Sequence, residues 1–317
     1  MIDLLRNKSI IINSDLDGLI SGFLLEKYLN CEIVGFTNSE EKVWFNESCK
    51  TPYSEICFID IFIANPDIIT VDQHIISANE KHYTILKENK NKINPNLLNP
   101  RFHIPGSSYR NKYPFGTVHF LIALMEKEGF NLKELNLFKQ FRGIQLIDLI
   151  LRADDTMKTT VDSRYVENAA AWWQWLIDLS QNGTITLSFK KHLETLDAKK
   201  VSEIKETISK LLKSAPYYCD TSDGGIKTLT LDFYLRENVF NYLKFLSEFL
   251  EIELFDLGSK YKVFRGNAHR ISLNNRQKEE LIKSNSIDDK RLFSYAFVKS
   301  DIKSQSFSAT FYQNKKG

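Results

Sequence analysis

The chain has 317 residues, a hydrophobic fraction of 43% and a formal net charge of +2 at pH 7. This length exceeds the usual size of one compact domain, so we expect two domains. The nearly balanced charge makes neither nucleic acid nor an acidic membrane a required partner, and no apolar stretch is long enough to span a membrane.

In chain order, the first half of the sequence alternates predicted strands with predicted helices. The expected strands are short and apolar: 8–12, 32–36, 56–59 and 68–71. The expected helices have apolar residues at helical spacing: 19–29, 118–127, 144–152 and 166–179. Residues 94–113 are rich in Pro, Asn, Gly and Ser, which predicts a long loop.

The second half is expected to begin with a charged connecting helix at 194–214, which Pro216 ends. A strand at 226–233, a helix at 237–250 and strands within 252–264 should follow, and a closing hairpin is expected at the end: 292–298 with 304–312. This order predicts an α/β fold, with a parallel-sheet domain and a second, smaller α/β domain. The expected boundaries are 1–185 for the first domain, 186–216 for the connection and 217–317 for the second domain.

The four cysteines, Cys31, Cys49, Cys57 and Cys219, form no C-x-x-C pair. This usage is typical of a reducing compartment. The first eight residues are too polar for a signal peptide. We therefore expect a soluble, cytoplasmic protein without a membrane partner.

Acidic residues follow three of the predicted strands. The first strand leads to Asp15 and Asp17, the third to Asp60 and the fourth to Asp72. Because ligands bind outside the carboxyl ends of parallel strands, these acids should share one site, where they repel each other unless a cation lies between them. A further acid, Asp154, follows the helix at 144–152. Carboxylates with one or two imidazoles suit manganese or magnesium.

The chain thus carries four ordered motifs: Asp15-x-Asp17-Gly18, Asp60, Asp72-Gln73-His74 and Ala153-Asp154. In this order they resemble the motifs of the DHH phosphoesterase superfamily. Two further elements agree with its single-strand exonuclease and oligoribonuclease branches: Asn99-Pro100-Arg101 and Gly116-Thr117. The resemblance covers roughly the first half of the chain. It implies a phosphodiesterase that uses two Mn²⁺ or Mg²⁺ ions to hydrolyse short or single-stranded oligonucleotides or small nucleotide diesters, with a C-terminal domain that grips the substrate.

The resemblance also implies roles for individual side chains. The ligands of the first metal would be Asp15 and Asp60, with Asn13 beside them, and those of the second Asp17, Asp60, Gln73 and Asp154. His74 would hydrogen-bond a phosphate oxygen or donate a proton to the leaving group, and Asp72 would orient His74 or a metal-bound water. The expected substrate contacts are Arg101, His103, Gly116, Thr117 and His119. A solvated loop is the alternative for Arg101 and His103, and helix packing is the alternative for His119.

One residue departs from the family pattern. Gln73 stands where the family has the first histidine of its triplet, which is a ligand of the second metal. An amide oxygen can ligate a hard cation, but it lacks the donor strength of imidazole, so we expect the second site to be weak.

Two other functions stay open. The chain could be a catalytically degenerate DHH domain that binds nucleic acid or a protein partner, or it could be an inorganic pyrophosphatase, although the basic tail that would grip pyrophosphate is not evident. The expected partners are short or single-stranded nucleic acid or a nucleotide, together with a second copy of the chain or a partner subunit.

Overall fold

The computed structural model describes residues 1–38, 42–99, 101, 111–139, 141–150, 163–219, 221–222, 225–226, 232–256, 260–301 and 304–312. The chain forms two compact units, and each unit combines separate stretches of sequence. The first unit contains Met1–Leu4, Ser14–Tyr28 and Pro114–Asp256. The second contains Leu5–Asn13, Leu29–Tyr113 and Leu257–Gly317.

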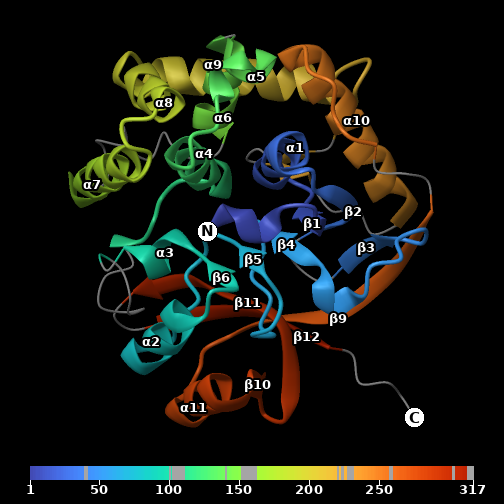
Figure 1. Cartoon of the computed structure of the whole chain (residues 1–317), viewed down its shortest axis with the longest axis vertical. Coiled ribbons are helices and arrows are strands. Elements are labelled where there is room, and N and C mark those ends of the chain that lie inside the picture. The colour runs from blue at the N-terminus through green and yellow to red at the C-terminus, as the bar shows by residue number, and fades with distance from the viewer. Residues whose placement is uncertain are drawn as a thin grey trace. The chain divides into compact units, whose positions relative to one another are not determined.

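The second unit holds a ten-stranded mixed sheet, in the order β10-β11-β12-β9-β3-β2-β1-β4-β5-β6 (Figure 1). One side of the sheet is parallel: β2 (Glu32–Thr37), β1 (Ser9–Asn13), β4 (Cys57–Ile59), β5 (Thr70–Val71) and β6 (Lys92–Ile93). The other side is antiparallel: β3 (Lys42–Asn46), β9 (Tyr261–Ile271), β12 (Ser304–Tyr312), β11 (Lys290–Asp301) and β10 (Ser286–Ile287). The predicted α/β class is therefore confirmed.

The central strand β1 explains why the apolar runs of the sequence become parallel strands. Ile10, Ile11 and Ile12 have no exposed surface, and β2 and β4 pair with β1 on its two sides. A strand that is covered on both faces needs a continuous apolar run and not an alternating one. The polar residue that ends such a run therefore marks the carboxyl end of the strand.

Side-chain caps set the helix starts of the second unit. Asn79 accepts a hydrogen bond from the His82 N–H at the start of α2 (Glu80–Glu88), and Asn94 does the same for Asn96 at the start of α3 (Pro95–Leu98). In α11 (Asn275–Ser284), Asn274 and Gln277 form a reciprocal capping box. The short helix η2 (Tyr53–Glu55) precedes β4.

The first unit is mainly helical. Its helices are α1 (Leu16–Leu29), α4 (Thr117–Lys127), α5 (Asn136–Lys139), α6 (Phe141–Ile150), α7 (Ser163–Leu179), α8 (Thr184–Glu194), α9 (Ala198–Lys213) and α10 (Asp232–Leu250), with short 3-10 turns at η1 (Ile2–Leu5) and η4 (Leu132–Glu134). The short strands β7 (Thr221–Ser222) and β8 (Gly225–Ile226) pair with each other. Helix α4 packs against α7 and α8, and α6 packs against α8, α9 and α10. Trp172 and Trp173 of α7 are buried in this helical core.

The helix predicted at 194–214 is present as α9, with a start four residues later than expected. The Asp197 carboxylate accepts a hydrogen bond from the Lys200 N–H and sets this start, and the preceding helix α8 ends at Glu194.

The strands predicted in the second half are partly wrong. Residues 252–256 form no strand and Asp232 already belongs to α10, whereas the closing hairpin of β11 and β12 is confirmed. The strand that does form, β9, pairs with β3 and β12, because tertiary pairing outweighs local strand propensity. The C-terminal strands thus continue the N-terminal sheet. The domain boundaries at 185 and 216 stay a prediction.

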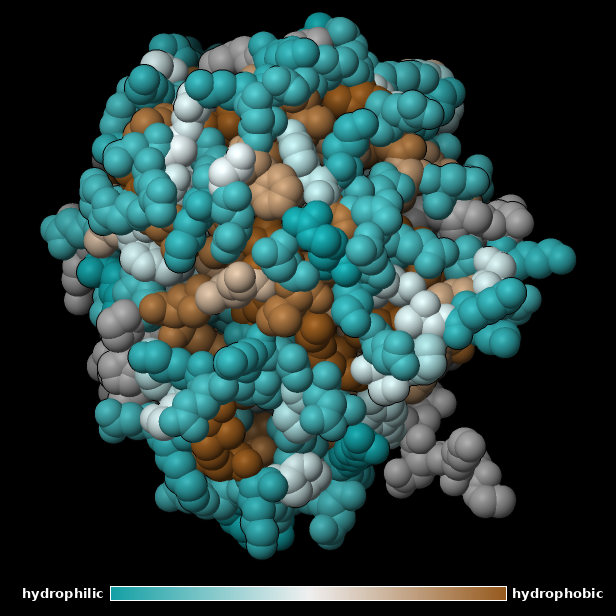
Figure 2. All heavy atoms as spheres, in the orientation of Figure 1, coloured by the Kyte–Doolittle hydropathy of each residue, from teal (hydrophilic) through white to brown (hydrophobic). Residues whose placement is uncertain are grey.

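Within the part of the chain that is described, no helix combines the length and the apolar character that a bilayer crossing requires. Hydrophilic side chains cover most of the face that Figure 2 shows, with smaller apolar areas between them.

A buried histidine in α2 leads to the first prediction. His82 is 2% exposed, its Nδ1 accepts the Ala78 N–H at 3.2 Å, and burial lowers its pKa to about 4. Since the unfolded chain binds this proton near pH 6.5, the contribution of His82 to stability is complete above pH 6.5. As the pH falls from 6.5 to 4, this histidine should lower the free energy of unfolding by roughly 3 kcal/mol, because the unfolded chain takes up the proton more readily than the folded chain.

His82→Gln keeps an acceptor for Ala78 and cannot be protonated. Urea unfolding between pH 7 and pH 4 should therefore show a shallower loss of stability in His82→Gln than in the native chain. The same change at His269, an exposed histidine, is the control. Equal slopes in the native chain and His82→Gln would contradict the prediction.

Candidate metal site

Polar side chains stand at the carboxyl ends of neighbouring parallel strands in the second unit. Asn13 ends β1, Asp60 follows β4, Asp72 follows β5 and Asn94 follows β6. Their exposed fractions are 6%, 2%, 1% and 1%, respectively. Buried polar groups at one edge of a parallel sheet are the usual setting of a ligand site in α/β proteins.

Three of the residues at this edge come together as a candidate metal site. Asp60, Asp72 and His74 each offer one ligand atom, and these atoms all lie within 4.8 Å of one another. The two aspartates are buried, whereas the His74 side chain is 37% exposed, so the group has one side open to solvent. Two carboxylates and one imidazole form a donor set that suits Mn²⁺.

Asp72 holds His74 in place through two contacts. One carboxylate oxygen lies 2.6 Å from the His74 Nδ1, and the other accepts the His74 backbone N–H at 3.0 Å. A carboxylate on one ring nitrogen fixes the tautomer and the direction of the imidazole, so the other nitrogen, Nε2, is the one available to a cation or a phosphate oxygen.

The charges around His74 also shift its proton equilibrium. Burial lowers the pKa of His74, but the Asp72 carboxylate and its hydrogen bond, together with the charge of Asp60, outweigh burial and raise the pKa to about 9. The positive charge of Lys112 acts in the opposite direction. His74 is therefore a cation at neutral pH as long as the site holds no metal.

Asp60 has an unusual backbone. Its φ of 61° lies in the left-handed region, which costs energy for a residue other than glycine, although aspartate and asparagine tolerate it best. The Asp60 N–H donates to the Val71 carbonyl at 2.8 Å, and one of its carboxylate oxygens accepts the Asn13 Nδ2 at 3.0 Å. Such backbone conformations concentrate at functional sites, where surrounding contacts hold them.

Two asparagines that the sequence-based reasoning assigned to a loop support this site. Asn94 donates to the His74 carbonyl at 2.8 Å and lies 3.4 Å from an Asp72 oxygen. Asn96 donates to the Gln73 carbonyl at 2.7 Å and accepts the Tyr113 N–H at 2.9 Å. A sequence pattern could have indicated Asn94, because this residue directly follows β6, as Asp60 follows β4 and Asp72 follows β5.

The first motif lies mainly in the first unit, where its acids cap helices. Asp15 accepts the Gly18 N–H at 3.0 Å and caps α1. The buried Asp17 accepts the backbone N–H groups of Thr117 and Val118 at 2.7 Å each, at the start of α4. Gly116 precedes these groups, and a Cβ at this position would lie 2.7 Å from the Asp17 carboxylate. Asp17 is therefore a helix cap, whatever further role it has.

The other predicted substrate contacts lie in different surroundings. Arg101 is exposed in a turn, and Thr117 is fully buried in the first turn of α4. His119 is buried among Phe115, Trp173 and Phe189 in the first unit, and burial lowers its pKa to about 3. His103 and Asp154 lie outside the described residues.

Comparisons with protein-family models, with curated proteins and with solved structures find no match for this chain.

Proposed function

We propose that the chain is a metal-dependent phosphodiesterase with Asp60, Asp72 and His74 as the centre of its active site. The close approach of two buried carboxylates and an imidazole carries this proposal, because this set of donors suits a divalent cation. The resemblance to the DHH phosphoesterase superfamily belongs to the same proposal. The substrate class would be short or single-stranded oligonucleotides or small nucleotide diesters.

The residues divide the chemistry among them. Asp60 and the Nε2 of His74 would hold Mn²⁺ or Mg²⁺, which when bound polarises a phosphoryl oxygen and lowers the pKa of a coordinated water. Asp72 fixes the direction of the His74 ring, and Asn94 holds the His74 backbone through its carbonyl. In the alternative role of His74, the ring stays off the metal and its Nε2–H hydrogen-bonds a phosphate oxygen or protonates the leaving oxygen. A second ion would depend on Asp17, Gln73 and Asp154, and it stays a prediction from sequence.

One observation favours the alternative function, a degenerate domain that binds nucleic acid or protein. Both carboxylate oxygens of Asp17 accept helix N–H groups, so this acid has a structural role that does not require a metal. A chain without catalysis could keep Asp17 for stability alone. Hydrolysis of a substrate distinguishes the phosphodiesterase from the binding domain.

The test is hydrolysis of short RNA, short DNA, cyclic dinucleotides and pyrophosphate, each with manganese and with a chelator. We expect turnover of at least one phosphodiester with manganese and none with the chelator. Turnover of pyrophosphate alone would support the pyrophosphatase. If no substrate is hydrolysed, the proposed enzyme is wrong and the binding domain is the function that remains.

Gln73 provides the second prediction. Its backbone is held by Asn96, and its side chain lies in sequence between the site residues Asp72 and His74. Gln73→His should lower the manganese concentration for half-maximal activity by about tenfold, because imidazole is a stronger donor than an amide. Gln73→Ala should raise it. Manganese titrations of all three proteins test this, and activity that appears only in Gln73→His would contradict an active native enzyme.

Lys112 provides the third prediction. Asn96 bonds to both Gln73 and Tyr113 and so holds the neighbouring Lys112 close to the site, where its charge acts on His74. Lys112→Met should tighten manganese binding and weaken inhibition by inorganic phosphate, each by about two- to fivefold, since a positive charge repels the metal and attracts the anion.

Lys112→Arg is the matched control, and it should change neither constant much. If both ligands weaken together in Lys112→Met, the lysine supports the structure of the loop and does not act through its charge.

A cytoplasmic location is part of the proposal. All four cysteines lie among the described residues, and none of them is in a disulfide, which fits a reducing compartment. The proposed partners remain short or single-stranded nucleic acid or a nucleotide, and a second copy of the chain or a partner subunit.

A further inference from the structure

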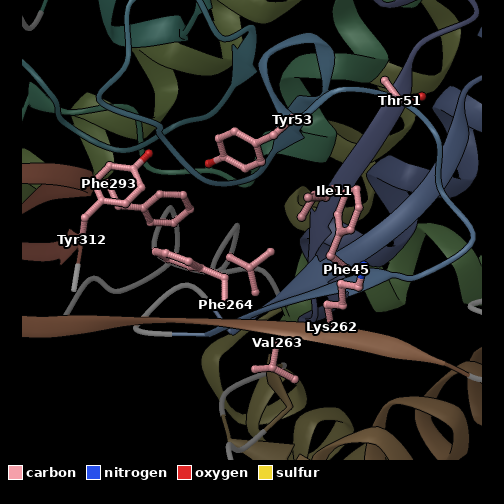
Figure 3. A pocket seen from close by; sticks show the side chains of 10 residues that line it. Ile11, Phe45, Thr51, Tyr53, Lys262, Val263, Phe264, Phe293 and Tyr312 are labelled. Carbon is pink, nitrogen blue, oxygen red and sulfur yellow. The ribbon is translucent and has the colours of Figure 1, made fainter. Parts of the chain in front are cut away.

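An aromatic pocket lies against the apolar core of the second unit. Its volume is about 420 Å³, which falls within the range of small-molecule sites. The residues that line it come from β1, β3, β9, β11, β12 and the segment before β4: Ile11, Val43, Phe45, Thr51, Tyr53, Lys262, Val263, Phe264, Phe293 and Tyr312. Figure 3 shows Phe264, Phe293 and Tyr312 gathered on one side of the pocket and Ile11 with Phe45 on the other.

The residues that line this pocket differ in their burial. Ile11 and Phe293 belong to the apolar core, and Phe45, Phe264 and Tyr312 pack against that core without being fully covered. Phe264 and Tyr312 meet edge to face, with ring centroids 5.7 Å apart. Partly exposed aromatic faces around a hollow gain free energy when another ring covers them.

Polar groups of the pocket lie around the aromatic faces. The hydroxyls of Tyr53 and Tyr312 influence each other electrostatically, and Figure 3 shows their hydroxyl ends turned toward one another. A ring with hydrogen-bonding atoms on its edge could contact these hydroxyls, as ligands commonly do in otherwise apolar pockets.

The charged groups at this pocket are positive. Lys262 is opposite Phe45 in the β3–β9 pair and lines the pocket. The Arg291 guanidinium lies 5.4 Å from the centroid of the Tyr312 ring. Among the described lining residues none carries a carboxylate. A negatively charged ligand is therefore favoured over a positively charged one at this pocket.

We propose that this pocket binds a small planar aromatic molecule that carries one anionic group. The ring would lie between Phe45 and the Phe264–Tyr312 wall, and the anionic group would face Lys262. A nucleotide and an aromatic carboxylate share this chemistry. The proposal does not depend on the metal site, because no residue of the candidate metal site lines the pocket.

Calorimetric titration of the full chain in the presence of a chelator tests the proposal. The probes are AMP and 1-naphthoate, their neutral counterparts adenosine and 1-naphthalenemethanol, and octanoate as a non-aromatic anion. We expect at least one aromatic anion to bind with a stoichiometry of one and more tightly than its neutral counterpart. AMP alone identifies a nucleotide site, and 1-naphthoate alone identifies a carboxylate site.

The variants are Lys262→Gln, Phe264→Leu and, as a control on the same strand, Arg270→Gln, which lies outside the pocket. Lys262→Gln should weaken the anion three- to tenfold and leave the neutral counterpart unchanged, whereas Phe264→Leu should weaken both. Because Lys262 is exposed, its replacement does not threaten folding. The proposal is overturned if neither aromatic anion binds below millimolar concentration, if octanoate binds as tightly, or if Arg270→Gln matches the effect of Lys262→Gln.

Discussion

Asp60→Asn should reduce manganese-dependent hydrolysis by roughly a thousandfold and leave the fold intact. Asparagine tolerates the left-handed backbone at this position, and its amide oxygen can still accept the Asn13 Nδ2 hydrogen bond. The substitution thus removes the negative charge and little else. Initial rates at saturating manganese, compared with the free energy of unfolding of the metal-free protein, measure the two effects separately.

The matched control is Asp67→Asn, which changes an exposed aspartate in the loop between β4 and β5. Its rate should equal that of the native chain. If Asp60→Asn retains native activity, or loses activity only because it has unfolded, then Asp60 is not a ligand and the proposed site is wrong.

Asp17→Asn should destabilise the first unit by about 2 to 3 kcal/mol, the second large effect that we expect. The Asp17 carboxylate accepts two backbone N–H groups of α4 at 2.7 Å while almost fully buried. An asparagine amide offers only one oxygen, and its NH₂ group would face the second N–H. Relief of repulsion between crowded acids would predict the opposite sign, namely an equal or greater stability.

Asp15→Asn is the matched comparison, since Asp15 caps α1 and asparagine is as good a cap as aspartate. Its free energy of unfolding in urea should lie within about 0.5 kcal/mol of the native value. If Asp17→Asn is as stable as Asp15→Asn, Asp17 does not act as a cap, and charge repulsion governs this motif.

Much of the parallel sheet was predictable because its signals are local. The apolar runs at β1, β2 and β4 are continuous, and each ends at a polar or turn-forming residue. The neighbourhood of Asp60 and Asp72 follows from the same pattern, since the carboxyl ends of adjacent parallel strands meet at one edge. The Asp72–His74 contact spans only two residues.

The remaining parts depend on distant partners that one sequence does not reveal. The start of β9 pairs with β3, which lies more than two hundred residues earlier in the chain. The apolar residues after Ile252 therefore predicted a strand that begins too early. Asp17 is a cap only because α4 begins a hundred residues later. Asn94 and Asn96 belong to a segment whose composition is that of an ordinary loop. Their structural role comes from their hydrogen bonds to the backbone carbonyls of His74 and Gln73, which the composition does not reveal.

A titration of the metal-free chain with manganese tests the proposed metal site, because the electron paramagnetic resonance signal of free Mn²⁺ reports the unbound ion. We expect the native chain to remove at least one ion per chain from solution, and we expect Asp60→Asn to lose this binding. A signal that grows in proportion to added manganese up to millimolar concentration would show that Asp60, Asp72 and His74 hold no metal, and it would contradict the proposed function.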